Sequence, residues 1–272
     1  MRILFLGDVI GRAGRRMLFD RLPDLRKRLA ADIVIVNGEN SAHGFGITPT
    51  IAREFFAHGV DVVTTGNHVW DHKEIFGYIG SEPRLLRPQN YPEGTPGNGY
   101  GVFALRSGAR ILVVNLMGRL YMDPLDDPFT ALDKVLSRFS LGGDVAAIVV
   151  DFHAEATSEK MGFGHYADGR VSLVVGTHTH IPTADHQILP GGTAFQTDTG
   201  MCGDYDSVIG MKKHTPIQRF VRRVPGERLQ PADGVVTLVG LLVDTDDKTG
   251  LAKRVQPLRL GGRLEETMPE GG

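Results

Sequence analysis

Short runs of apolar, mostly β-branched residues recur along the chain, and each run stops at polar residues. Such runs are typical of strands that are buried on both faces of a sheet. They predict strands at residues 3–6, 32–36, 60–65, 145–150 and 171–177. Apolar residues at helical spacing predict helices at residues 15–30, 49–57, 70–79 and 128–139, with a further helix between residues 155 and 171. The alternation of strands and helices indicates an α/β fold.

The remaining segments have weaker patterns. Residues 83–101 are rich in proline, glycine and asparagine, which indicates an irregular excursion rather than a domain boundary. Apolar segments on either side of a short turn predict a hairpin of residues 100–105 and 110–116. Further strands are predicted at residues 193–196, 235–243 and 253–260. We expect residues 1–272 to form a single domain, with a flexible tail after about residue 261.

Composition narrows the class of protein. With 272 residues, of which 41% are hydrophobic, the chain can bury a large core. The net charge of −2 argues against an extended nucleic-acid surface, so we expect a small-molecule partner, with a homo-oligomer as an alternative to a monomer. Cys202 is the single cysteine, which excludes an intrachain disulfide and a zinc thiolate cluster. No apolar stretch approaches the roughly 20 residues that span a membrane, so we expect a soluble, cytoplasmic protein.

Two histidines, His178 and His180, directly follow the predicted strand at residues 171–177. A single histidine is more often a core or surface residue than a metal ligand. Residues i and i+2 of an extended segment point the same way, so these two imidazoles should leave the strand end toward one point. That geometry suits a metal ion, which neutral imidazole binds well.

Other predicted strands also end in groups that can bind a metal. The polar residues that follow them are Asp8, Glu39, Asn40, Asn67, His68 and His153. Parallel strands place such residues at one edge of a sheet, where ligands bind in open α/β sheets. This set contains no sulfur, is too large for one ion, and suits manganese, iron or zinc better than magnesium or calcium. Two ions about 3.5–4 Å apart, bridged by a carboxylate, can activate a water and hold the oxygens of a phosphate ester.

Several neighbouring residues have two interpretations. Arg12 could contact a phosphate or lie on the surface as an ordinary charge. His43 and His72 could touch a substrate, although packing or solvent-facing roles are favoured. The glycine-rich residues 197–204 could line the site, and within them we expect Cys202 to be a small buried apolar residue.

The order of these motifs resembles that of the calcineurin-like metallophosphoesterases. The matching segments are Gly7-Asp8, Gly38-Glu39-Asn40, Gly66-Asn67-His68, His153 and Gly176-Thr177-His178-Thr179-His180. The resemblance implies a sandwich of two mixed β-sheets flanked by helices, in four α/β/β/α layers. In two departures, Ile10 stands where the first motif usually has histidine, and Glu39-Asn40 stands where the bridging aspartate is usual.

With these departures, the segments Gly-Asp-Val-Ile-Gly-Arg-Ala-Gly and Asn-Gly-Glu-Asn are similar to those of the YmdB-like family of 2′,3′-cyclic-nucleotide phosphodiesterases. The resemblance implies hydrolysis of 2′,3′-cyclic nucleotides to 3′-nucleotides through a metal-bridging hydroxide. It also implies two transition-metal ions, iron or manganese with zinc as an alternative. One ion would be held by Asp8, Glu39, Asn40 and His180, and the other by Glu39, Asn67, His153 and His178. His68 would stay unligated and protonate the leaving group, a role that suits an imidazole.

Two other functions stay open. The ligand set does not separate a cyclic diester from a phosphomonoester, so a broader phosphatase acting on nucleotide or protein phosphomonoesters is an alternative. A catalytically silent, metal-binding regulatory protein is the other. His68 distinguishes a hydrolase from the silent protein, because a purely structural metal site does not need an unligated imidazole beside it.

Overall fold

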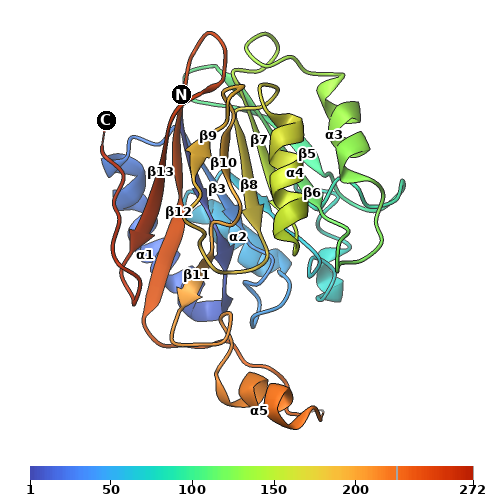
Figure 1. Ribbon diagram of the computed structural model, residues 1–272, viewed down its shortest axis with the longest axis vertical. Coiled ribbons are helices and arrows are strands. Elements are labelled where there is room, and N and C mark those ends of the chain that lie inside the picture. The colour runs from blue at the N-terminus through green and yellow to red at the C-terminus, as the bar shows by residue number, and fades with distance from the viewer. Residues whose placement is uncertain (225, 272) are drawn as a thin grey trace.

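Two mixed β-sheets pack face to face in the computed structural model, which describes residues 1–224 and 226–271 (Figure 1). The α-helices of these residues are α1 (Gly11–Arg28), α2 (Pro49–Ala57), α3 (Pro128–Leu136), α4 (Thr157–Ala167) and α5 (His214–Arg222). The first four cover the outer faces of the sheets, whereas α5 projects from the body (Figure 1). The predicted four-layer sandwich is therefore confirmed.

The first sheet contains most of the N-terminal strands. In spatial order it is β2 (Asp8–Val9), β11 (Met201–Asp204), β12 (Val236–Thr245), β1 (Arg2–Leu6), β3 (Ile33–Asn37) and β4 (Val62–Thr64), with β13 (Ala252–Leu260) also paired to β12. The strands β1, β3 and β4 are parallel, with Phe5 opposite Ile35 and Val36 opposite Val63. Because β12 runs antiparallel to β1, the sheet is mixed.

The second sheet is built from the middle of the chain. Its order is β5 (Tyr100–Ala104), β6 (Arg110–Met117), β7 (Ala147–His153), β8 (Leu173–Thr177), β10 (Ala194–Gln196) and β9 (Gln187–Ile188). The four central strands are parallel, and β5 forms the predicted antiparallel hairpin with β6. The predicted strands of both sheets are confirmed, with ends that shift by one to three residues.

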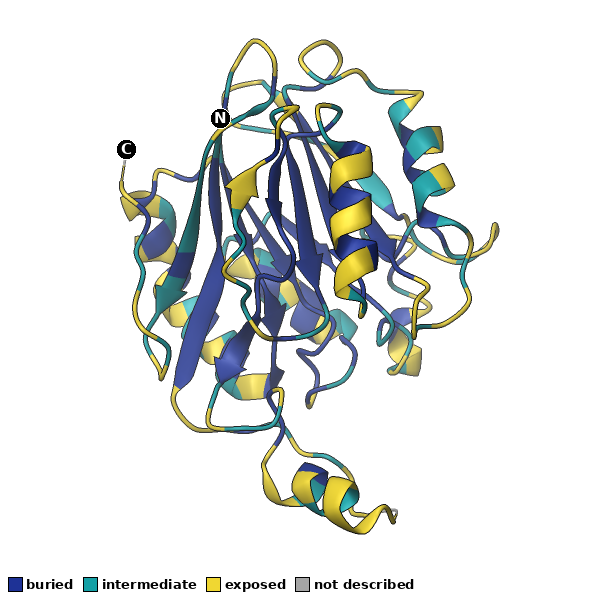
Figure 2. Ribbon diagram, viewed as in Figure 1, coloured by how far each residue is buried: buried dark blue, intermediate teal, exposed yellow. Residues whose placement is uncertain are grey.

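The apolar core has three layers, which explains why the central strands are apolar on both faces. Helices α1 and α2 pack on the first sheet, where Leu22 and Phe55 are buried, and α3 and α4 pack on the second, where Leu132 and Phe163 are buried. A third cluster lies between the sheets and joins residues such as Phe5 to residues such as Val149. Figure 2 shows the central strands buried, β13 mostly of intermediate exposure and β9 exposed, and the helices exposed on their outer faces.

A local cap explains where α2 begins, and packing explains the early start of α1. Thr48 caps α2 by accepting a hydrogen bond from the Ile51 amide at 3.3 Å, and Pro49 occupies the first helical position. Helix α1 begins at Gly11, four residues before the predicted start. The reason is packing, because a Cβ at Gly14 would lie 2.4 Å from the Cys202 carbonyl oxygen. The glycine therefore allows the helix to approach β11 closely rather than forming a loop.

The prediction of a helix at residues 70–79 is wrong. Only a 3₁₀ turn, η1 (Lys73–Ile75), forms within a series of turns. Gly77 and Gly80 favour the non-helical chain, and Trp70 is held instead by stacking on Phe76 at a ring separation of 4.7 Å. The apolar spacing reflected this aromatic packing rather than a helix.

Two C-terminal features complete the fold. The segment after Gly261, predicted to be flexible, returns along β13, where the backbones of Arg259 and Thr267 exchange hydrogen bonds of 2.7 and 2.9 Å. Helix α5 exposes an apolar face that includes Ile217, Phe220 and Val221, with Phe220 76% exposed.

Within residues 1–224 and 226–271, no helix combines the length and apolar character needed to cross a membrane.

Candidate metal centre

The expected metal ligands lie at the carboxyl ends of strands from both sheets. The first sheet supplies Asp8 on β2, Glu39 and Asn40 after β3, and Asn67 after β4. The second sheet supplies His153 at the end of β7, and His178 and His180 after β8. The expectation that they share one sheet edge is therefore wrong. The edges of two facing sheets meet at one centre, and the structure brings all seven residues to it.

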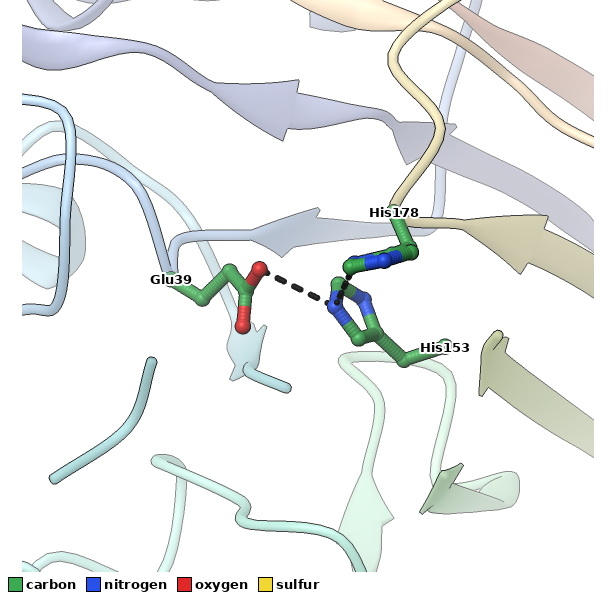
Figure 3. Close-up of side chains that lie close together, drawn as sticks. All are labelled: Glu39, His153 and His178. Carbon is green, nitrogen blue, oxygen red and sulfur yellow. Dashed lines mark hydrogen bonds and ion pairs between the residues drawn. The ribbon is translucent and has the colours of Figure 1, made fainter. Parts of the chain in front are cut away.

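Four ligand-type side chains form the first group of this centre. His153 Nε2 lies 3.0 Å from each of three atoms, Glu39 Oε1, Asn67 Oδ1 and His178 Nδ1. Glu39, His153 and His178 each offer an atom within 4.8 Å of the atoms offered by the other two (Figure 3). One metal ion could contact all of them.

Asp8, Asn40 and His180 form a second group beside the first. His180 Nε2 lies 3.2 Å from Asn40 Oδ1 and 4.0 Å from Asp8 Oδ1. The Asn40 amide donates from Nδ2 to the Gly44 carbonyl at 3.2 Å, which turns its oxygen toward His180. Asp8 Oδ1 also lies 3.9 Å from His153 Nδ1, so the two groups are neighbours.

Each of the three histidines has an outer hydrogen-bond acceptor that fixes its proton away from the centre. His153 Nδ1 lies 2.8 Å from Thr177 Oγ1, His178 Nε2 lies 3.1 Å from Glu155 Oε2, and His180 Nδ1 lies 2.9 Å from the Ile209 carbonyl. The other ring nitrogen of each histidine therefore faces the centre and can offer its lone pair to a metal ion. Such outer partners are typical of histidines that bind metals.

Two buried carboxylate oxygens at the centre need a cation. Asp8 Oδ1 accepts no hydrogen bond from any described residue, and Glu39 Oε1 faces only the His153 ring nitrogen Nε2 at 3.0 Å, although both side chains are fully buried. A buried carboxylate oxygen without a partner is costly, and ligation to a cation removes that cost. Gly66 keeps the space open, because a Cβ there would lie 2.3 Å from His153 Nε2 and 2.4 Å from Glu39 Oε2. The residues present therefore fit a metal centre.

The electrostatics also favour positive charge in the centre. Burial raises the pKa of Asp8 well above its ordinary value. Burial alone would raise the pKa of Glu39 too, but His153 lowers it to about 2. Burial alone would lower the pKa of His153, but Glu39 and Asp8 raise it to about 9. Burial and then the charge of His153 lower the pKa of His178 to about 3. The carboxylates thus draw in a positive charge, which a proton or a metal ion can supply.

The backbone of His178 and His180 differs from the sequence-based expectation. Strand β8 ends at Thr177, and the two histidines have φ values of 95° and 68°, in the left-handed region. They are not extended, so strand alternation does not explain why both face the centre. Non-glycine residues rarely adopt this conformation, which occurs mostly where surrounding contacts enforce it.

His68 lies at the edge of the centre rather than inside it. Its amide donates to Glu39 Oε2 at 3.1 Å, and its ring nitrogen Nδ1 lies 2.9 Å from Asp71 Oδ2. The ring also packs edge-on against Phe45, at a centroid distance of 5.1 Å. With 28% of its side chain exposed, the imidazole is open to a substrate in a way that His153 is not.

Sequence reasoning missed the groups that support the histidines. Buried Asp151 accepts hydrogen bonds from Asn37, Thr64 and Thr177, and Thr177 in turn accepts from His153. Burial raises the pKa of Asp151, an effect that His153 and these donors oppose. Asp151 lies two residues before His153 on β7, so alternation along a strand ending in a ligand was the available signal.

The other candidates lie outside the metal groups. Arg12 and His43 are exposed, and His72 Nε2 lies 3.0 Å from the Phe45 carbonyl. Cys202 is buried as expected, and burial raises the pKa of its thiol to about 12. Within residues 197–204, Gly200 lies beside Asp8, whose amide donates to the Gly200 carbonyl at 3.1 Å.

Comparisons with known proteins agree with this geometry. A family model described as "YmdB-like protein" matches residues 4–258. The chain is 47% identical over 256 residues to the 2′,3′-cyclic-nucleotide 2′-phosphodiesterase of Bacillus subtilis (strain 168), covering 94% of this chain and 96% of that protein. A hypothetical protein from Thermus thermophilus has a crystal structure that is 43% identical with a TM-score of 0.89, covering 97% of this chain and 100% of that chain. The calcineurin-like phosphoesterase YfkN from Bacillus subtilis, at 10% identity, shares the fold with a TM-score of 0.58 over 95% of this chain and 90% of that chain. The chain belongs to the YmdB-like protein family.

Proposed function

We propose that this protein is a metal-dependent phosphodiesterase that hydrolyses 2′,3′-cyclic nucleotides to 3′-nucleotides. The observation that carries the proposal is the convergence of inward-facing ring nitrogens from three histidines with two buried carboxylates, of which Asp8 Oδ1 accepts no hydrogen bond from a described residue. The name of the Bacillus subtilis relative supports the choice of substrate.

The proposed ligand sets follow the two groups described above. Asp8, Asn40 and His180 would hold one ion with Glu39, and Glu39 would also hold the second ion with Asn67, His153 and His178. This mixture of oxygen and nitrogen donors suits iron, manganese or zinc. Two such ions, when bound, supply the positive charge that activates a water and holds the phosphate oxygens.

The protein residues would control the protons of the reaction. In hydrolysis of the cyclic diester, water adds to phosphorus and the bond from phosphorus to the 2′ oxygen breaks. His68, held by Asp71 at the exposed edge, would give a proton to that departing oxygen. The product would be the 3′-monophosphate with a free 2′ hydroxyl.

A parallel assay tests this function. Protein loaded with manganese or iron is given 2′,3′-cyclic AMP, 3′,5′-cyclic AMP, AMP and a phosphopeptide, and metal content is measured by elemental analysis. We expect fast release of 3′-AMP from the first substrate alone. Preferred attack on AMP or the phosphopeptide would favour the broader phosphatase, and loaded protein without any hydrolysis would favour a silent metal-binding protein.

We also propose that residues 1–272 form one domain that associates with copies of itself. The apolar cluster shared by the two sheets supports the single domain. The exposed apolar face of α5 supports the association, because monomeric proteins seldom expose such a face without a binding role. Light scattering should give a larger mass for the wild type than for the Phe220→Ser protein, and equal masses would contradict the association.

A further inference from the structure

A buried ion pair lies directly behind the loop that carries His178 and His180. Lys160 on α4 is 1% exposed, and its Nζ lies 2.7 Å from Asp198 Oδ2. Asp198 follows β10 and is fully buried. Burying two charges is costly and adds little stability, so such a pair is best explained by the specific arrangement that it enforces.

Asp198 also accepts hydrogen bonds from the loop that carries His178 and His180, and from Gly200. Its Oδ2 accepts hydrogen bonds from both the amide and the hydroxyl of Thr179, at 3.1 and 2.7 Å. Its Oδ1 accepts from the Gly200 amide at 2.7 Å. Thr179 is the residue between His178 and His180, so these hydrogen bonds tie the middle of the loop to the ion pair.

The left-handed backbone conformation of this loop requires contacts that stabilise it. His178 and His180 both have positive φ, which side chains with a Cβ avoid. On either side, the His178 amide donates to Asp8 Oδ2 at 3.3 Å, and the His180 carbonyl accepts from the Met201 amide at 3.1 Å and from the Tyr205 hydroxyl at 3.3 Å. None of these contacts involves Thr179, whose hydrogen bonds to Asp198 fix the residue between the two left-handed positions.

We propose that Lys160 and Asp198 are positioning residues that hold the loop in its left-handed conformation through Thr179, so that His178 and His180 each aim one nitrogen at a different metal group. Lys160 neutralises Asp198 within the core, and Asp198 fixes the loop. The proposal rests on the proposed metal centre but assigns a role to residues outside it. It predicts that the loop is held even before any ion binds.

The first test measures the loop without metal. Hydrogen exchange of residues 176–181 is compared in metal-free wild type, Thr179→Val, Thr179→Ser and Lys160→Met proteins. The valine removes the hydroxyl with little change in volume, whereas the serine keeps it. We expect exchange about tenfold faster in Thr179→Val and Lys160→Met, with Thr179→Ser close to wild type, because local opening sets the exchange rate.

The second test measures Mn²⁺ affinity by equilibrium dialysis. Affinity should fall about 10- to 100-fold in Thr179→Val and Lys160→Met, the usual effect of losing support behind a metal ligand. The matched control is Arg2→Met, which breaks the Arg2–Asp244 ion pair of 2.7 Å at the amino end of β1. It should lower the melting temperature without changing affinity.

The outcomes separate this inference from the proposed function. Wild-type exchange and affinity in Thr179→Val, or an equal loss of affinity in Arg2→Met, would overturn the positioning role. If Lys160→Met fails to fold, the comparison of Thr179→Val with Thr179→Ser still tests the positioning role. Absence of cyclic-nucleotide hydrolysis by the wild type would overturn the proposed function and leave the exchange result standing.

Discussion

His153 and His68 contact different carboxylate oxygens of the same glutamate, Glu39, and belong to two different regions of the site. His153 is fully buried, and its Nε2 lies 3.0 Å from Glu39 Oε1. His68 is partly exposed, and its backbone amide donates to Glu39 Oε2 at 3.1 Å. Their outer partners also differ, because His153 Nδ1 contacts the Thr177 hydroxyl and His68 Nδ1 contacts the Asp71 carboxylate.

The difference shows how a partner can set the role of an imidazole. Thr177 donates its single proton to Asp151, so it accepts from His153 Nδ1, and the second nitrogen of His153 is left to face the centre, where it can bind either a proton or a metal ion. Asp71 is a carboxylate, which can accept a hydrogen bond from His68 Nδ1. We therefore expect the inner histidine to bind a cation and the outer histidine to donate a proton to the leaving group.

The largest expected effect comes from removing the charge that both regions share. Glu39→Gln should lose the metal ions and reduce hydrolysis to background, because the proposed bridging ligand loses its charge. Elemental analysis and the rate of 3′-AMP release measure the two effects. Glu82→Gln, which disturbs the Arg84 ion pair on the surface, is the control and should keep both. Full metal occupancy in Glu39→Gln would remove Glu39 from the ligand sets.

The next largest effect should separate the inner and outer regions. His68→Ala should keep the metal ions but lose about 10²–10⁴-fold in turnover, the usual contribution of a general acid. A His68→Ala protein that lacks metal would mean that His68 belongs to the inner region.

The leaving group sharpens the same prediction. A p-nitrophenyl phosphodiester releases a weakly basic oxygen that needs little help from an acid. His68→Ala should therefore lose much less activity on this ester than on 2′,3′-cyclic AMP. Equal losses on both substrates would contradict proton donation by His68.

The sequence predicted which residues meet at the centre better than it predicted their geometry. Apolar runs that stop at Asp8, Glu39 and His153 are local signals, because a buried strand needs apolar residues and its end needs none. The left-handed backbone of His178 and His180 depends on contacts with distant residues, which no local pattern contains. The residues that the structure brings together were thus selected for a partly wrong geometric reason.

The missed elements of the fold have physical reasons of the same kind. The strands β2 and β11 contain only two and four residues, too few for a periodic pattern. Helix α5 has nine residues, no side-chain cap and an apolar face that meets no core. The two short strands form because they pair with other strands in the folded chain, and α5 projects from the body. Neither property can be recognised from the local sequence.

A smaller effect should come from the outer partner of the inner histidine. Thr177→Val keeps the side-chain shape but removes the acceptor of the His153 proton. The ring can then change tautomer, so we expect a 10- to 100-fold loss of metal affinity, as for other groups that orient metal-bound histidines. Thr177→Ser is the matched control and should stay near wild type in equilibrium dialysis. Unchanged affinity in Thr177→Val would show that the hydroxyl does not orient His153.

The smallest effect should come from the outer partner of the outer histidine. Asp71→Asn keeps a similar shape but replaces the carboxylate that holds His68 Nδ1 at 2.9 Å. Both side chains are partly exposed, which weakens their interaction, so we expect about a tenfold loss of turnover with metal content unchanged. The double variant His68→Ala/Asp71→Asn should be no slower than His68→Ala, because Asp71 acts only through the ring. Additive losses would show that Asp71 contacts the substrate itself, and the contrast between the two histidines would then need another explanation.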